Sequence, residues 1–270
     1  MQIVRSMLSL LLLLVAVTAA AQTTATGVDR LYILDCGNSR APDQSRWSPG
    51  VNVGKSIELS DNCYLLRHAS GYFVWDTGYP DSIGDKPVTT PVGTASRNRT
   101  LASQLAEIGV KPSDVRFVGI SHTHGDHVGN VESFPAATVL IQKAEYEWAF
   151  AADKKPPFDA KHAVRKLEGD LDVFGDGSAT IISTPGHTPG HQSLLVHLPK
   201  TGWIVLSGDA AHFKDNWDNK RVPSMNVDGA QTLASMKRIA DLMAARKAEL
   251  WINHDKPQSD TQRHSPQFYD

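Results

Sequence analysis

The chain has 270 residues, of which 41% are hydrophobic and 21% are charged. This size and balance are typical of a globular protein that can bury a full core, as one large domain or two small ones. The formal net charge is -2 and no run of Lys or Arg occurs, so the charge excludes an evident nucleic-acid-binding or membrane-binding surface.

The first 21 residues differ from the rest of the chain. Arg5 precedes an almost wholly apolar run, Leu8–Val17, and the small residues Ala19–Ala21 follow it. A cation, a short apolar run and a small-residue cleavage site are typical of a secretory signal peptide. A membrane-spanning helix needs about 20 apolar residues, so this run is too short for an anchor. We therefore predict a signal peptide at 1–21 and an exported domain at 22–270, periplasmic or secreted and free of the membrane after cleavage.

The mature domain begins with three predicted strands, at residues 30–35, 62–66 and 71–75, where aromatic and β-branched residues lie between turn-forming residues. Cys36 follows the first strand and Cys63 lies in the second. If the two strands are adjacent, the cysteines could form a disulfide, which the oxidising compartment implied by export permits. The alternative, two unpaired buried cysteines acting as small hydrophobic side chains, is the interpretation we favour.

The remaining elements alternate along the chain. Residues 79–99 are rich in Pro, Gly, Thr and Asp without periodicity and are predicted as a long loop, as are residues 154–161. Helices are predicted where apolar residues share one face, at 100–108, 144–152 and 229–247. The last of these places on one stripe Leu233, Met236, Ile239, Ala240 and Met243. Further strands are predicted at 115–120, 138–141, 180–183, 193–198, 203–207 and 250–253. This order favours a single α/β (α+β) domain, with packed sheets and helices outside them.

Four side chains of the kind that bind metals occur within six residues, directly after the strand at 115–120: His122, His124, Asp126 and His127. Imidazole and carboxylate groups suit zinc and related divalent ions. Because side chains alternate along a strand, His122 and His124 project from one face. Gly125 then allows a turn that brings Asp126 and His127 to the same space. One strand end can therefore supply ligands to two ions.

Three more ligand-type residues each follow a predicted strand: His187, Asp209 and His254. Strand ends at one edge of a layered sheet are a common place for a site. A lone histidine is usually a core or surface residue, but that reading does not explain seven such side chains at four strand ends. We predict a centre for two divalent metal ions, with Zn2+ expected first and Mn, Fe or Co also compatible.

The pattern His-x-His-x-Asp-His, then Pro-Gly-His187, Gly-Asp209 and His254, resembles the metallo-β-lactamase superfamily over nearly all of the mature chain. The resemblance implies an αββα sandwich with Asp209 bridging the two ions. The remaining ligands would divide into His122, His124 and His187 for one ion and Asp126, His127 and His254 for the other.

The same resemblance implies a mechanism. Asp76, in the Asp-Thr-Gly turn that follows the strand at 71–75, would be structural or would support the ligands. A hydroxide between the ions would attack the substrate carbonyl, and one ion would stabilise the oxyanion. Asp126 would act as a catalytic residue that accepts the proton or passes it to the leaving oxygen.

Within the superfamily, the ligand spacing, the compact length and the segments Leu31–Cys36 and Trp75–Asp81 are similar to N-acyl-homoserine lactonases. Such enzymes open the lactone ring of N-acyl-homoserine lactones, the acyl-tailed signals of bacterial quorum sensing, so the implied role is quorum quenching on a small-molecule acyl lactone. The candidate regions for lining the acyl tail are 79–99 and 210–228, the latter with Phe213 and Trp217.

Two positions depart from the lactonase pattern. Gly125 stands where these enzymes often carry an aromatic residue, which opens the pocket and removes a substrate contact. His212 stands where they often carry a Tyr, three residues after Asp209. We predict His212 as a catalytic residue that hydrogen-bonds the lactone carbonyl or assists the leaving oxygen, with an ordinary loop histidine as the alternative.

Other members of the superfamily are alternatives. A periplasmic metallo-β-lactamase with a cysteine ligand is excluded because neither cysteine follows His187, and Asp209 as a bridging ligand argues against the cysteine-free subclass. A glyoxalase II-like thioesterase shares all seven ligands but normally carries a helical extension, where only residues 255–270 follow His254. A persulfide dioxygenase-like iron oxidoreductase uses fewer of these ligands. A protein that only binds metal would lack a ligand, and none is missing.

The resemblance also allows a homodimer, although no interface can be traced in the sequence. One further histidine, His191, closes the segment Pro-Gly-His-Thr-Pro-Gly-His and is predicted to be structural or to support a ligand. The histidines predicted as ordinary surface or core residues are His68, His162, His197 and His264.

Overall fold

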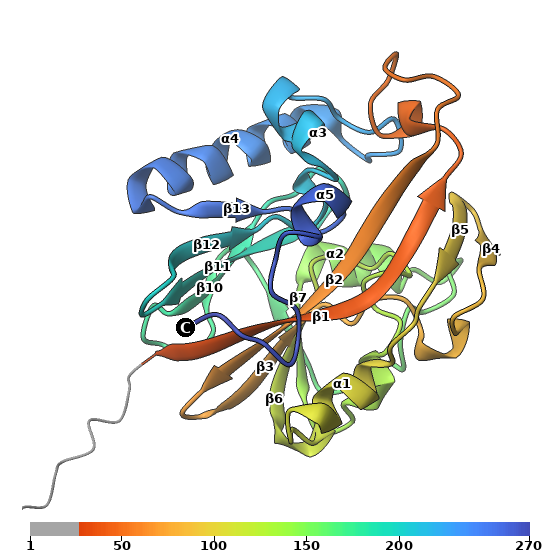
Figure 1. Ribbon diagram of the computed structural model, residues 1–270. Helices are drawn as coiled ribbons and strands as arrows, with labels where there is room; N and C mark the ends of the chain where they lie inside the picture. Colours follow the sequence, from red (N-terminus) through yellow and green to blue (C-terminus); the bar gives the residue numbers. More distant parts are fainter. Residues whose placement is uncertain (1–26) are drawn as a thin grey trace, which may run out of the picture.

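Two β-sheets pack face to face and carry helices on both outer faces in the computed structural model, which describes residues 27–270 (Figure 1). The eight-stranded sheet has the order β4-β5-β1-β2-β3-β6-β7-β8, and the five-stranded sheet has the order β13-β12-β11-β10-β9. The predicted αββα sandwich is confirmed. The predicted signal peptide lies outside the described residues. No helix within residues 27–270 is long and apolar enough to cross a membrane.

The eight-stranded sheet is antiparallel from β4 to β3 and parallel from β3 to β8. Its strands are β1 (Val28–Ala41), β2 (Ile57–His68), β3 (Gly71–Trp75), β4 (Val88–Thr90), β5 (Gly93–Ser96), β6 (Val115–Gly119), β7 (Thr138–Gln142) and β8 (Val164–Leu167). The five-stranded sheet is antiparallel except for the β12–β13 pair. Its strands are β9 (Leu171–Asp172), β10 (Ala179–Ser183), β11 (Gln192–Leu198), β12 (Gly202–Leu206) and β13 (Glu249–Trp251).

The helices divide between the two outer faces. α1 and α2 lie on the outer side of the eight-stranded sheet, and α4 covers the five-stranded sheet (Figure 1). Two short helices, α3 and α5, lie near the upper end of the strands in this view. The helices are α1 (Leu101–Glu107), α2 (Lys143–Ala149), α3 (Lys214–Asn219), α4 (Gly229–Arg246) and α5 (Lys256–Ser259).

Alternation along β1 shows how the sequence builds these layers. Leu31 and Ile33 belong to the hydrophobic cluster between the two sheets, with strands of both contributing. Tyr32 and Leu34 belong to the cluster on the outer face, which includes Leu101 of α1. Successive side chains of a strand point to opposite faces, so an unbroken apolar run is what a strand buried on both sides requires.

The predicted apolar stripe of α4 is wrong at its first residue. Leu233 is 41% exposed, and the buried side of the first turns is formed by small polar residues such as Thr232. The cause is a close approach of backbones: a Cβ at Gly186 would lie 2.3 Å from the Thr232 nitrogen. A leucine side chain has no room there, so α4 turns Leu233 to solvent and buries Met236 and Ile239 further along.

The region predicted as a structureless loop, 79–99, contains the β4–β5 hairpin. β5 pairs with β1 through Asn38–Arg40, so the hairpin extends the edge of the eight-stranded sheet. These strands are short, and β4 is almost wholly exposed, so they lack the apolar alternation that signals a strand. Backbone pairing to an edge forms them instead. β8, β9, α3 and α5 are likewise not predicted from the sequence.

Cys36 and Cys63 form a disulfide, so the favoured interpretation of two unpaired cysteines is wrong. β1 and β2 are antiparallel neighbours, and an irregularity in their register falls between Asp35 and Gly37. The residue between these two is thereby placed beside Cys63, with a Cα–Cα distance of 5.7 Å. Strand pairing could be anticipated from sequence, but the bulge that aligns the two side chains could not.

Replacing both cysteines, Cys36→Ala with Cys63→Ala, is expected to lower the free energy of unfolding by about 3 kcal/mol. The crosslink spans 27 residues of sequence, and closing a loop of that size in the unfolded chain accounts for this amount. Urea unfolding of the oxidised protein, the reduced protein and the double variant measures it. Equal stability of the oxidised protein and the double variant would contradict the prediction.

Candidate metal centre

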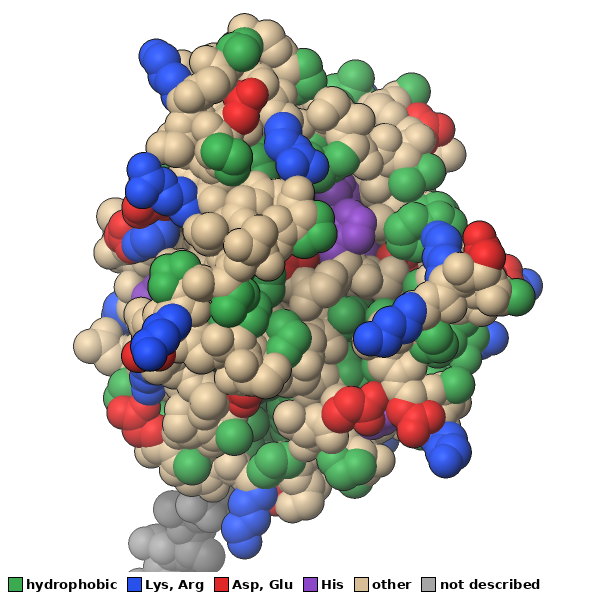
Figure 2. Space-filling model, turned by 90° about the vertical axis from the view of Figure 1, so that its right-hand side faces the viewer, with side chains coloured by type: hydrophobic (Ala, Val, Ile, Leu, Met, Phe, Trp, Pro, Cys, Tyr) green, Lys and Arg blue, Asp and Glu red, His purple; other side chains and the backbone are tan. Residues whose placement is uncertain are grey.

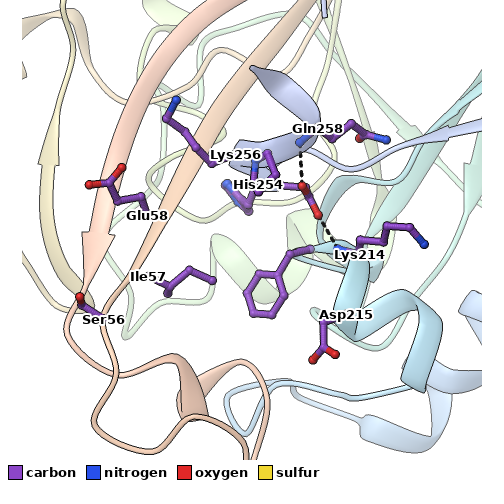
Figure 3. Close-up of a pocket in the computed structure, with 11 residues that line it drawn as sticks. Ser56, Ile57, Glu58, Lys214, Asp215, His254, Lys256 and Gln258 are labelled. Atoms are coloured by element: carbon purple, nitrogen blue, oxygen red, sulfur yellow. Dashed lines mark hydrogen bonds between the residues drawn. The ribbon is translucent and has the colours of Figure 1, made fainter. Parts of the chain in front are cut away.

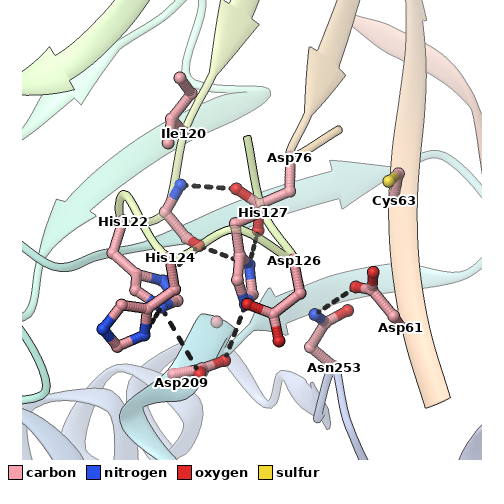
Figure 4. A network of polar contacts seen from close by, with 12 residues as sticks. Asp61, Cys63, Asp76, Ile120, His122, His124, Asp126, His127, Asp209 and Asn253 are labelled. Atoms are coloured by element: carbon pink, nitrogen blue, oxygen red, sulfur yellow. Dashed lines mark hydrogen bonds and ion pairs between the residues drawn. The ribbon is translucent and has the colours of Figure 1, made fainter. Parts of the chain in front are cut away.

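The seven predicted ligands converge at one edge of the sandwich, where strands of both sheets end. Figure 4 shows five of them: His122, His124, Asp126, His127 and Asp209. The run 121–127 follows β6, and His187 lies in the connection from β10 to β11. Asp209 lies in a short 3-10 turn directly after β12, and His254 follows β13. The convergence of strand ends predicted from the sequence is therefore present.

The ligand-type side chains form two groups, and within each group one ligand atom per residue lies within 4.8 Å of the others. The first group is His122, His124, His187 and Asp209. The second group is Asp126, His127 and His254. This division matches the two ligand sets that the superfamily resemblance implies.

Asp209 faces both groups. Its Oδ2 lies 3.6 Å from His122 Nε2 and 3.3 Å from His187 Nε2. Its Oδ1 lies 3.4 Å from His127 Nε2 and 3.2 Å from His254 Nε2. A single buried carboxylate thus directs one oxygen toward each group, as a ligand shared between two ions requires.

The residues present fit two divalent cations. His127 Nε2 and Asp209 Oδ1 are both buried, and neither has a hydrogen-bond partner among residues 27–270. Leaving such an atom unsatisfied costs about 1–3 kcal/mol, so buried polar atoms normally have a partner. Nitrogen and carboxylate donors aimed at a common point are the set that zinc and similar ions bind.

Burial keeps the first group's imidazoles in the form that binds metal. It lowers the pKa of His122 and of His187 well below the ordinary histidine value, so both rings are neutral. Burial alone would raise the pKa of Asp209, but the surrounding histidines, His212 and His254 foremost, hold it well below its ordinary value. Neutral rings and an ionised carboxylate are the states that coordinate divalent ions.

In the second group, by contrast, the surroundings raise the pKa values of the two histidines. Burial disfavours a protonated His127, but the carboxylates of Asp209 and Asp76 outweigh it and raise the pKa of His127 well above its ordinary value. Burial also lowers the pKa of His254, but the carboxylate of Asp209 outweighs burial and raises this pKa to about 9. The carboxylates therefore require positive charge at these two rings, which either protons or a divalent cation can supply.

Asp76 supports the ligand segment, as predicted. It follows β3 with a positive φ of 56°, and its Oδ1 accepts a hydrogen bond from the Ser121 nitrogen at 2.7 Å. Its Oδ2 lies 2.9 Å from His127 Nδ1 (Figure 4). One carboxylate therefore orients both the start of the ligand run and its last ring, leaving Nε2 of His127 directed at the site.

Other contacts hold the remaining rings. His191 Nε2 accepts a hydrogen bond from the Asp209 nitrogen at 2.9 Å, which supports its predicted structural role. His187 Nδ1 lies 2.8 Å from Asn226 Oδ1, and His254 Nδ1 donates to the Ser60 carbonyl at 2.7 Å. Neither Asn226 nor Ser60 is predicted from the sequence. Both come from segments distant in sequence, and neither belongs to a motif.

His212 lies beside the two groups and lines the cavity that opens above them. Its Nε2 is 3.0 Å from Asp209 Oδ2, and its ring stacks on that of His254 with centroids 5.5 Å apart. The Trp47 ring lies on another side, at 6.3 Å. His212 is only 3% exposed, so it is not an ordinary surface-loop histidine.

A cavity of about 550 Å³ lies above these groups, and histidine side chains are visible at the bottom of a hollow in the molecular surface (Figure 2). Gly125 lines it, and a Cβ at that position would meet nothing within 4 Å, so the site is open there as predicted. The opposite walls are mainly apolar and come from several segments: Trp47, Leu59, Ile83, Val88, Val92 and Met225.

Two residues predicted to line this cavity do not. Phe213 lines a second cavity, of about 820 Å³. Lys214, His254 and Lys256 line the same cavity (Figure 3). Trp217 packs instead against the cluster between α4 and the five-stranded sheet. The region 210–228 still contributes one apolar wall, through Met225, because the chain beyond α3 returns to the cavity.

Residues 57–250 match the Metallo-beta-lactamase superfamily, and the chain belongs to this superfamily. Among its relatives, the N-acyl homoserine lactonase AttM of Rhizobium radiobacter is 31% identical, over 89% of this chain and 98% of AttM. An N-acyl homoserine lactonase from a Bacillus species is 30% identical, over 84% of this chain and 94% of that protein.

Solved structures agree with these relatives. A quorum-quenching N-acyl homoserine lactone lactonase superposes with a TM-score of 0.80 at 28% identity, covering 90% of this chain and 99% of that one. An N-acyl homoserine lactone hydrolase, solved with the product N-hexanoyl-L-homoserine at its catalytic metal center, has a TM-score of 0.79 at 28% identity, covering 90% and 100%. The fold is thus that of lactonase structures.

Metal content is expected to respond differently to two substitutions. His254→Ala removes a ligand from one group and should leave about one tightly bound ion per chain. Asp209→Ala removes the carboxylate that faces both groups and should weaken both ions. Metal analysis after dialysis against a weak chelator measures this, with the exposed His197→Ala as a control that keeps two. Retention of two ions by Asp209→Ala would contradict a shared ligand.

Proposed function

We propose that this protein is a dinuclear-metal hydrolase, with zinc as the expected ion, that opens the lactone ring of N-acyl-homoserine lactones. The observation that carries the proposal is the composition of the cavity: ligand-type side chains form its base, and apolar side chains form its opposite walls. An N-acyl-homoserine lactone has the same division, with a polar ring at one end and an alkyl tail at the other. The relatives named as lactonases support this choice.

The residues divide the chemistry between them. When bound, two divalent cations would supply Lewis acidity, lowering the pKa of water toward neutrality and polarising the lactone carbonyl. Asp126 lies at the cavity, with its carboxylate 4.0 Å from Nε2 of both His127 and His254. We propose that Asp126 accepts a proton from the attacking water and delivers it to the alkoxide of the opening ring.

His212 completes the proposed arrangement. Its ring nitrogen lies at the cavity base beside Asp209, and Trp47 and His254 hold the ring on two sides. A substrate bound above Asp209 would bring its carbonyl or leaving oxygen within reach of the His212 N–H. This hydrogen bond would strengthen as negative charge develops on the oxygen.

Four of the six apolar wall residues belong to a hydrophobic cluster separate from the main cores: Trp47 and Leu59 lie in it, and Val92 and Met225 pack against it. An alkyl tail in the cavity would extend this cluster. We propose that the alkyl tail of the substrate occupies the cavity beside this cluster, because burial of each methylene group contributes about 0.8 kcal/mol to the free energy of binding.

We also propose that the protein acts after export. The signal-peptide pattern at 1–21 motivates this, and the Cys36–Cys63 disulfide is compatible with an oxidising compartment. Fractionation of cells that produce the full chain would test the localisation. Retention of the protein in the cytoplasm with residues 1–21 still attached would overturn it.

The activity is tested by proton release from residues 22–270, loaded with zinc, on N-acyl-homoserine lactones of several tail lengths. A cephalosporin and an S-acyl-glutathione serve as rival substrates. Lactone opening is expected, and Asp126→Ala should lower kcat by about 100-fold or more, as for a lost proton carrier. His212→Ala should lower kcat while His197→Ala does not. Turnover of a rival alone would overturn the lactonase proposal but not the metal centre.

Tail recognition makes a separate prediction. Met225→Ala should lower kcat/KM for a decanoyl lactone about tenfold more than for a butanoyl lactone, because the long tail loses roughly 1–2 kcal/mol of apolar contact. Val53→Ala is the control, since Val53 is 69% exposed and does not line the cavity. Equal losses for both lactones would show that the tail does not contact Met225.

A further inference from the structure

Glu145 of α2 is a buried carboxylate outside the two ligand groups. It is 0% exposed, and no Lys, Arg or His within residues 27–270 forms an ion pair with it. Burying an unpaired carboxylate is costly, and such groups rarely occur without a compensating role.

Both of its oxygens accept hydrogen bonds, each from a different segment of the metal centre. Oε1 accepts from the Thr123 nitrogen at 2.8 Å and from Thr123 Oγ1 at 2.7 Å. Oε2 accepts from the Gly190 nitrogen at 3.0 Å. Thr123 lies between His122 and His124, and Gly190 lies three residues after His187. One side chain therefore joins the two segments that carry the first group's histidines.

The contact with Gly190 brings main chains together. A Cβ at Gly190 would lie 2.3 Å from the Glu145 nitrogen, so any larger residue would push the segment away from α2. Gln142, just before the helix, adds a further link, donating through Nε2 to Gln192 Oε1 at 2.9 Å. Gln192 in turn donates to the Ile120 carbonyl at 2.8 Å, just ahead of the ligand run. The start of α2 thus holds both segments at a fixed separation.

We infer that Glu145 is a positioning residue for one of the two metal sites, the one formed by His122, His124 and His187. It sets the distance between the two segments that supply these rings. Three donated hydrogen bonds offset its negative charge, and a cation held by these rings would offset it further. The rings of the second group have supports of their own: Asp76 Oδ2 lies 2.9 Å from His127 Nδ1, and His254 Nδ1 donates to the Ser60 carbonyl at 2.7 Å. Glu145 makes no hydrogen bond to either ring; its hydrogen bonds within the described residues go to Thr123 and Gly190. The inference rests on the proposed metal centre and not on the choice of substrate.

Glu145→Gln is the decisive variant because it keeps size and shape. An amide has only one acceptor oxygen, so either orientation leaves a donor pointing at the nitrogen of Thr123 or of Gly190. Loss of an outer hydrogen-bond partner typically costs 10–100-fold in metal affinity. We expect a loss of this size for one of two zinc equivalents and an unchanged second equivalent. Zinc titration of the metal-free protein against a competing chelator resolves the two.

Thr123→Val supplies a milder variant, since it removes the hydroxyl donor and keeps the backbone one. It should weaken the same equivalent by a smaller factor. Gln104→Ala is the matched control: Gln104 is also buried on a helix and bonds both backbone groups of Asp35, and none of its hydrogen bonds goes to the segments that carry the ligands. It should lower the Tm of the metal-free and zinc-loaded protein alike and leave both affinities unchanged.

The thermal stability gives a second readout. A ligand stabilises the folded state by an amount that grows with the logarithm of its affinity, so the rise in Tm on adding zinc should shrink in Glu145→Gln and not in Gln104→Ala. Equal weakening of both equivalents, or of neither, would overturn the inference while leaving the lactonase proposal standing. If the unmodified protein binds no zinc, the proposed metal centre is wrong and the inference is overturned with it.

Discussion

The structure of the site depends on one buried carboxylate, that of Asp209, which four ligand-type histidines surround at 3.2–3.6 Å. A negative charge in the protein interior is stable only if positive charge or hydrogen-bond donors surround it. The histidine rings that surround Asp209 lie at the ends of strands. Hydrogen bonds orient three of these rings: Asp76 contacts His127, Asn226 contacts His187, and the Ser60 carbonyl contacts His254. The sandwich is the frame that fixes these distances, since rigid strands end where the ligands begin.

Sequence reasoning was most reliable where a residue's role is local. The run His122–His127 indicates a metal site by residue type and spacing. The strands with alternating or continuous apolar residues are also predicted from the sequence, although β1 and β2 are longer than the predicted 30–35 and 62–66. It failed where the partner is remote. The bulge that aligns Cys36 with Cys63 leaves no trace in composition, and the β4–β5 hairpin is formed by backbone pairing with an edge. Neither feature produces a periodic pattern of apolar side chains, which is the pattern from which strands and helices are predicted.

The supporting contacts show the same limit. Glu145 sits in an unremarkable helical segment, and only the fold reveals that its two oxygens bond segments about 20 and 45 residues away in the chain. The apolar walls were anticipated in the right region but through the wrong residues, because Phe213 turns toward another cavity and Met225 takes the place expected for it. The sequence indicates which loop lies near the site, but not which cavity each side chain of that loop faces.

The β4–β5 hairpin has a consequence for how this enzyme can diverge. It is the outermost part of the eight-stranded sheet, it contacts the rest of that sheet through a few backbone pairs of β1, and it carries none of the ligand-type residues. Its side chains can therefore be exchanged without disturbing the machinery below. Selection on such a protein could retune which molecules it accepts through a handful of changes at this margin, while the inherited reaction is passed on intact.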